Sequence, residues 1–209
     1  MLIKPCETVL FQGDSITDAG RFRADPAHLG SGYAMIAASW IAAEYPDHNI
    51  NFINRGISGN RAADLVSRWQ QDCIQLAPDW VSIMIGINDT WRSFDENDST
   101  TPESYETSLR ICLQQAREKL GCRFILIEPF VLPYPDDRKL WRNDLEPRIE
   151  IVKRLAKEFK AILIHMDKIM NEAAVANGTP AYWANDGVHP TPAGHGLLAK
   201  HWLKAVAAI

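Results

Sequence analysis

The stretch Val9-Leu10-Phe11-Gln12-Gly13-Asp14-Ser15-Ile16-Thr17-Asp18 decides how this chain folds. Its apolar start is typical of a strand buried on both faces, and the small polar residues that follow are typical of a sharp turn. Four more apolar runs of this kind occur further along the chain. The predicted strands are residues 8–11, 50–53, 80–85, 124–127 and 162–165.

Segments between these strands have helical periodicity, because their apolar residues recur about every 3.6 positions on one face. Four such stripes begin at Tyr33, Leu65, Tyr105 and Leu145, although Pro147 leaves the start of the fourth uncertain. A final helix begins at Thr191-Pro192, which is a good N-cap followed by proline. The alternation predicts an α/β fold, a doubly wound three-layer α/β/α sandwich with a five-stranded parallel sheet of flavodoxin-like type, in a single domain over residues 1–209.

Polar and small residues that are candidates for a functional site follow three of the predicted strands. Ser15, Gly59 and Asn88 come after the first, second and third strands, and parallel sheets place their sites at those strand ends. Asp186-Gly187-Val188-His189 stands near the other end of the sequence. A serine hydroxyl needs a neighbouring base, and that base needs a third group to fix its tautomer. We therefore expect Ser15 to be a nucleophile, His189 its base and Asp186 the group that orients the base.

Four blocks of the sequence resemble those of the GDSL, or SGNH, hydrolases. They are residues 13–17, 54–60, 86–89 and 186–189, in the order that the family shows. The Gly-x-Ser-x-Gly elbow of the larger α/β-hydrolase fold is absent. The resemblance implies the SGNH hydrolase fold and a carboxylic ester hydrolase. It also implies three donors to the oxyanion of the tetrahedral intermediate, namely the backbone N–H groups of Ser15 and Gly59 and the side-chain amide of Asn88.

Aromatic and polar residues flank these blocks. Trp91 and Arg92 follow the third block and Trp183 precedes the last, and flat indole faces beside polar groups suit a sugar ring. The tryptophans could equally be core or subunit-contact residues. Asp14 is grouped with these substrate-binding candidates, although we expect it first to accept backbone N–H groups and brace the turn. Residues 128–139 form a proline-containing loop that is either a wall of the substrate cleft or a plain surface excursion.

Longer runs around the blocks are similar to the intracellular bacterial acetylxylan-esterase-like branch of the family. This likeness implies removal of O-acetyl groups from xylo-oligosaccharides or similar acetylated sugars, and it makes a homo-oligomer plausible. Another SGNH specificity, such as a lysophospholipase, a thioesterase or a short-chain carboxylesterase, remains an alternative. A flavodoxin-type binding module is a third hypothesis, but the chain has no GxGxxG or Walker loop to hold a phosphate.

Composition argues against several other classes. The formal net charge is −4 and no basic stripe is present, so we expect no nucleic-acid partner. No run approaches the roughly 20 apolar residues of a membrane span, and Lys4, Pro5 and Glu7 interrupt any signal-peptide core, so we expect no membrane partner. The four cysteines lack metal or disulfide spacing, which predicts reduced thiols in a cytoplasmic protein. No histidine pairing indicates a metal, and we expect no cofactor.

Overall fold

A five-stranded parallel sheet forms the centre of the computed structural model, which describes residues 1–209 apart from the side chain of Asn177. The strands lie in the order β2-β1-β3-β4-β5, and every neighbouring pair is parallel. This confirms the predicted fold class, and each strand lies within two residues of its expected bounds. The strands are β1 (Thr8–Gly13), β2 (Asn51–Asn54), β3 (Trp80–Met84), β4 (Arg123–Ile127) and β5 (Ile162–Ile164).

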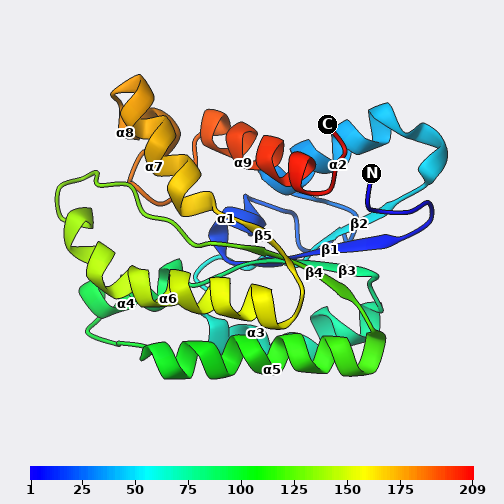
Figure 1. The fold of residues 1–209 in the computed structure, drawn as a ribbon, viewed down its shortest axis with the longest axis horizontal. Helices are drawn as coiled ribbons and strands as arrows, with labels where there is room; N and C mark the ends of the chain where they lie inside the picture. The colour runs from blue at the N-terminus through cyan, green and yellow to red at the C-terminus, as the bar shows by residue number, and fades with distance from the viewer.

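Helices cover both faces of this sheet (Figure 1). One face carries α2 (Tyr33–Glu44) and α9 (Pro192–Ala205), and the other carries α3 (Ala62–Asp72), α5 (Pro102–Leu120) and α6 (Arg138–Glu158). Shorter or peripheral elements complete the chain. They are α1 (Ser15–Asp18), α4 (Ile87–Asp95), α7 (Met166–Asn177) and α8 (Pro180–Trp183), with 3-10 turns η1 (Pro46–His48) and η2 (Ile74–Leu76).

Two apolar layers hold the sheet between its helices. Val9 and Phe11 belong to the layer that includes α2 and α9, whereas Leu10 belongs to the layer under α3, α5 and α6. Successive residues of a strand point to opposite faces, so a strand covered on both sides must be apolar throughout. A buried polar contact joins α9 to the sheet, because the Trp202 indole donates to Ser82 Oγ at 3.0 Å.

Helix α6 differs from the expectation based on Pro147. It begins at Arg138 and continues through the proline, which lies inside the helix. In the same turn the fully buried Arg148 side chain bends back to Asp144, with 2.5 Å from Nη1 to the backbone oxygen and 2.7 Å to Oδ1. Tertiary packing and this added link hold a helix that proline alone would interrupt. The stripes gave no sign of α1, α4, α7 or α8.

Three of the four cysteines are buried as free thiols. Cys112 on α5 and Cys73 at the C-cap of α3 are buried free thiols, as their positions in the apolar stripes predicted, and Cys122 is buried as well. Among the described residues, no helix combines the length and the apolar character needed to cross a bilayer.

Candidate active site

The turn after β1 presents Ser15 at the first position of α1. Asp14 is the N-cap of this helix, and its Oδ1 accepts a hydrogen bond from the Ile16 N–H at 3.0 Å. Gly13 is required before it, since a Cβ atom there would lie 2.4 Å from the Met84 backbone oxygen. A buried strand that breaks into a capped turn therefore fixes the position of the serine hydroxyl.

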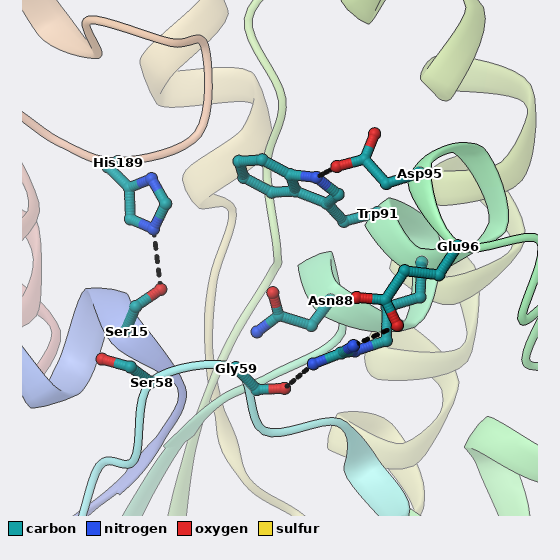
Figure 2. Close-up of a pocket in the computed structure, with 9 residues that line it drawn as sticks. Ser15, Ser58, Gly59, Asn88, Trp91, Asp95, Glu96 and His189 are labelled. Carbon is teal, nitrogen blue, oxygen red and sulfur yellow. Dashed lines mark hydrogen bonds and ion pairs between the residues drawn. The ribbon is translucent and has the colours of Figure 1, made fainter.

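The loop before α9 brings His189 to this serine. His189 Nε2 lies 2.8 Å from Ser15 Oγ, across 174 residues of sequence (Figure 2). Its Nδ1 lies 2.7 Å from Asp186 Oδ2. The other carboxylate oxygen, Oδ1, accepts the N–H groups of His189 at 2.7 Å and Val188 at 3.0 Å. The structure thus brings the three residues predicted from the sequence into one hydrogen-bonded chain.

The pKa values of Asp186 and His189 suit the transfer of a proton from Ser15. Burial would raise the pKa of Asp186, but hydrogen bonds from the His189 ring and from two backbone N–H groups lower it to about 2. The hydrogen bond with Asp186 raises the pKa of His189 above 6.5, against the opposing effect of burial. An ionised Asp186 accepts the proton of Nδ1, which leaves Nε2 free to accept one from Ser15.

Leu132 and Arg138 form a brace that supports the Asp186–His189 loop. The Leu132 N–H donates to the Gly187 oxygen at 2.8 Å, and Arg138 Nε donates to the Asp186 backbone oxygen at 3.2 Å. Gly187 has φ +81°, and a Cβ atom there would lie 2.1 Å from the Tyr134 oxygen. The predicted loop at 128–139 is therefore neither a wall of the pocket nor a free excursion, because it buttresses the base and its orienting acid.

Gly187→Ala should therefore destabilise the protein and reduce ester hydrolysis. The added methyl group meets backbone oxygen atoms and the residue keeps a positive φ, so we expect a loss of about 1–3 kcal/mol in the free energy of unfolding, measured by urea denaturation. Gly196→Ala on α9 is the control, because its Cβ would meet nothing within 4 Å and an alanine favours the helix. Equal midpoints for the two variants would contradict the role of the brace.

The loop after β2 packs closely against α1. Asn54 is buried, and its amide donates to the Thr17 and Leu29 oxygens at 2.6 and 2.7 Å, while its Oδ1 accepts the Gly56 N–H at 2.8 Å. A Cβ atom on Gly56 would lie 2.3 Å from the Asp18 nitrogen. Asn54 thus fixes the approach of this loop to the serine turn. The sequence placed it in a family block but did not reveal this bridging role.

Asp18 holds the next part of the same loop. Its Oδ2 accepts the Ser58 N–H at 3.1 Å and the Ser58 hydroxyl at 3.3 Å, and it pairs with Arg23 at 2.8 Å. Burial would raise the pKa of Asp18, but Arg23 and these backbone donors hold it below its usual value. The ionised carboxylate therefore positions Ser58 and, next to it, Gly59.

Unsatisfied donors converge beside Ser15. Within the described residues, the N–H groups of Ser15 and Gly59 have no backbone acceptor, as expected for a first helical position and for a glycine with φ +83° in a turn. The Asn88 amide gives one hydrogen to the Asn60 oxygen at 3.0 Å, which leaves its second hydrogen free. In Figure 2 the Asn88 side chain points from α4 toward Gly59 and Ser15. Three donors therefore border the space above the serine oxygen.

A pocket of about 360 Å³ opens over this group. Trp91 forms one wall, with its ring 5.7 Å from that of His189 and its Nε1 donating to Asp95. Arg92 pairs with Glu96 at 2.5 Å. The residues lining the pocket are Ser15, Ser58, Gly59, Asn88, Trp91, Arg92, Asp95, Glu96 and His189.

Three of these lining residues were not predicted from the sequence. Ser58 lies in a recognised block without a stated role. Asp95 lies four positions after Trp91, and Glu96 lies four positions after Arg92, and both of those earlier residues were expected at the site. Residues four apart lie on the same face of a helix, so the spacing would have revealed both acids if α4 had been predicted.

Two other substrate-binding candidates lie outside the pocket. Trp183 is half-buried, packs against the core and rests edge-on against Tyr182. Asp14 is buried behind the turn, and burial raises its pKa to about 7. Asp89 is buried in the same way, with its pKa raised to about 6, and its Oδ2 accepts the Ala62 N–H at 3.1 Å. These acids hold loops in place. Among the described residues, no three His, Cys, Asp or Glu side chains form a group that could hold a metal ion.

Known proteins with similar sequences share this arrangement of elements. An acetylxylan esterase of Geobacillus stearothermophilus is 36% identical over 214 residues, covering 99% of this chain and 96% of that protein. Its crystal structure matches with a TM-score of 0.89. The structure of a GDSL-like lipase of Parabacteroides merdae matches with a TM-score of 0.92 at 36% identity, covering 100% of this chain and 99% of that one.

A more distant relative is named for thioesterase, protease and lysophospholipase activities. The thioesterase 1/protease 1/lysophospholipase L1 of Escherichia coli is 26% identical over 184 residues, which cover 88% of this chain and 76% of that protein. The model of the GDSL-like lipase/acylhydrolase family matches residues 11–197. These matches exclude the hypothesis of a flavodoxin-type binding module. The chain belongs to the GDSL-like lipase/acylhydrolase family and is a carboxylic ester hydrolase.

Proposed function

We propose that this esterase removes O-acetyl groups from acetylated sugars of the xylo-oligosaccharide type, through an acyl-enzyme on Ser15. The observation that carries the proposal is the hydrogen-bonded chain from Ser15 through His189 to Asp186, at the base of a pocket walled by an indole. The likeness to the Geobacillus acetylxylan esterase supports the substrate class. Variants of that enzyme with a serine or an aspartate replaced by alanine are described as catalytic mutants.

The first half-reaction transfers the acetyl group to the enzyme. Ser15 Oγ attacks the acetyl carbonyl carbon while His189 Nε2 takes the hydroxyl proton over their 2.8 Å contact. The negative charge moves to the carbonyl oxygen, where the donors of Ser15, Gly59 and Asn88 stabilise it. As the bond to the sugar oxygen breaks, His189 returns the proton to that oxygen, and acetyl-Ser15 remains.

The second half-reaction releases acetate. A water molecule attacks the acetyl carbon and His189 takes its proton, in the same geometry as before. The bond between the acetyl carbon and Ser15 Oγ then breaks, and His189 returns the proton to that oxygen. Asp186 stays ionised in both halves and stabilises the imidazolium, in line with its lowered pKa.

Asn88→Ala should lower kcat for acetyl ester hydrolysis by about 10²–10³ fold, because it removes one donor to the oxyanion. The KM should change little, since the ground-state carbonyl needs this donor less than the oxyanion does. Asn143→Ala is a suitable control, because Asn143 is exposed on α6 and lies outside the pocket. A kcat within threefold of the parent would exclude Asn88 as an oxyanion donor.

The activity should rise with pH through a midpoint above 6.5. His189 must be neutral to accept a proton, and the neighbouring Asp186 raises its pKa, so kcat/KM is lost as the pH falls through that raised value. Asp186 and Asp14 both favour the charged ring. Asp14 has a pKa of about 7 and would titrate in the same range, so the profile is repeated with Asp14→Asn. A flat profile from about pH 5 to 8 would contradict the role of His189.

The charges of the pocket favour a neutral sugar ester over phosphate-bearing substrates. Arg92 is paired with Glu96, and Asp95 adds a further carboxylate at the rim. Acyl-CoA and lysophospholipids would bring phosphate groups close to these acids, which costs free energy through like-charge repulsion. The uncharged hydroxyl groups of a sugar meet no such penalty, and its C–H faces can pack against the Trp91 indole.

A substrate panel tests this proposal. We expect acetylated xylo-oligosaccharides to be hydrolysed with a higher kcat/KM than acyl-CoA or lysophospholipid, with Ser15→Ala protein as the blank. Equal rates on the three classes, or a preference for the phosphate-bearing esters, would overturn the proposed substrate. Those outcomes would favour the thioesterase or lysophospholipase alternative that the Escherichia coli relative represents.

A further inference from the structure

A second and larger pocket, of about 560 Å³, lies beside the active-site pocket. The two are separated by the loop after β2, because Ile57 lines the second pocket and the next residue, Ser58, lines the first. The two pockets therefore share this loop as a common wall. The residues lining the second pocket are Arg21, Arg23, Arg55, Ile57, Gln71, Asp72, Gln75 and Leu76.

Positive charge dominates this lining. It contains three arginines and one aspartate, in a chain whose formal net charge is −4. The aspartate, Asp72, is already paired with Arg68 behind the pocket at 2.9 Å, and its other oxygen lies 3.8 Å from Arg55 Nε. Arg23 is paired with Asp18. Arg55 thus shares Asp72 at this longer distance, and among the described residues Arg21 forms no ion pair within 4 Å.

Hydrogen-bond donors on these two arginines are also unused. Among the described residues, the Arg21 side chain donates through Nε alone, to the Gly56 oxygen at 2.8 Å, and the Arg55 side chain through Nη1 alone, to the Asn54 oxygen at 3.2 Å. Burial lowers the pKa of Arg21, and repulsion from Arg55 and Arg23 adds to this effect against the attraction of Asp18. Neighbouring guanidinium groups that keep free N–H donors can bind an oxyanion. The planar pair of N–H donors of each guanidinium matches the two oxygens of a carboxylate.

The rest of the lining fits a sugar ring better than a bare anion. Ile57 and Leu76 supply apolar surface, while the exposed amides of Gln71 and Gln75 can bond to hydroxyl groups. A volume of about 560 Å³ is in the range of sites for organic ligands and far exceeds the size of an inorganic ion. We propose that this pocket binds the carboxylate-bearing ring of a uronic acid that is attached to the acetylated oligosaccharide whose ester lies at Ser15.

This inference rests on the proposed function, and kinetics on matched substrates test both. The variants are Arg55→Gln and Gln75→Glu, and Gln114→Glu, on an exposed face of α5, is the control for added charge. We expect both variants to lose about ten- to hundredfold in kcat/KM on an acetylated xylo-oligosaccharide with a glucuronic acid branch. Rates on the unbranched acetylated oligosaccharide and on p-nitrophenyl acetate should not change.

Direct binding separates the sources of the anion. Glucuronate, glucose 6-phosphate and inorganic phosphate are titrated into the parent protein and into Arg55→Gln and followed by NMR. Glucuronate binding that Arg55→Gln weakens supports the proposal. Preferential binding of either phosphate would overturn the assignment to a uronic acid, and so would a branch that gives no advantage in kcat/KM.

Failure of the proposed function would look different. The enzyme would then hydrolyse p-nitrophenyl acetate but neither acetylated oligosaccharide. In that case the link between this pocket and the Ser15 substrate is overturned together with the proposed function. If the unbranched oligosaccharide is hydrolysed and only the branch has no effect, the proposed function stands and the uronic acid site alone is wrong.

Discussion

Replacing Ser15 by alanine should lower ester hydrolysis on the order of 10³-fold or more. The variant removes Oγ, which lies 2.8 Å from His189 Nε2. The capped turn at the start of α1 holds this atom beside the oxyanion donors. Without Oγ no acyl-enzyme forms, and any remaining rate comes from water attack assisted by the oxyanion donors and His189. Hydrolysis of p-nitrophenyl acetate measures the loss.

The fold of the Ser15→Ala protein should remain native-like by circular dichroism, because among the described residues the hydroxyl forms a hydrogen bond with His189 alone. Ser39→Ala, on the exposed side of α2, is the matched control and should keep the full rate. A fluorophosphonate reagent should label the parent and the control but not Ser15→Ala. Full labelling of the Ser15→Ala protein, with the rate preserved, would show that another group is the nucleophile.

Asp186→Asn should reduce kcat/KM at neutral pH by about 10³–10⁴ fold, although only one atom changes in kind. Two backbone N–H groups, from Val188 and His189, fix Oδ1 as an acceptor. The new amide nitrogen must then take the place of Oδ2 and donate to His189 Nδ1. The ring responds by carrying its proton on Nε2, which cannot accept the proton of Ser15.

Asp136→Asn is the matched control, since Asp136 is exposed, pairs with Lys139 and lies outside the relay. Its rate should equal that of the parent. The tautomer in Asp186→Asn can be read from the ¹⁵N chemical shifts of the His189 ring. A loss of less than tenfold, or a ring that still carries its proton on Nδ1, would mean that Asp186 does not set the tautomer.

Sequence reasoning predicted best what strong periodicity or a family block encodes. The sheet follows from continuous apolar runs such as Val9-Leu10-Phe11, which need cover on both faces. The approach of Ser15 to His189 followed from the blocks and from the rule that sites lie at strand ends. Neither argument depends on long loops, and both agree with the geometry of the structure.

What the sequence did not reveal depends on tertiary contacts. Helix α4 has Ile87, Trp91 and Phe94 at helical spacing, but it is only nine residues long and begins inside a family block, so it was not predicted and Asp95 and Glu96 at its end were missed. Pro147 argues against a helix locally, but the packing of α6 and the buried Arg148 outweigh it. The support of Asp186 by Arg138 joins residues 48 apart and has no signature in either segment. Such contacts require the folded topology and do not follow from local propensity.

The acid and the base lie on one short loop, while the nucleophile lies on the turn that follows β1, an inner strand of the sheet. Asp186 and His189 therefore move as one unit. If α9 packed less tightly, the distance between the His189 imidazole and the Ser15 hydroxyl would change, while the contact between Asp186 and His189 would be kept. The catalytic rate therefore reports how well α9 packs on the sheet. Mutations far from the pocket that shift α9 should reduce turnover before they unfold the protein.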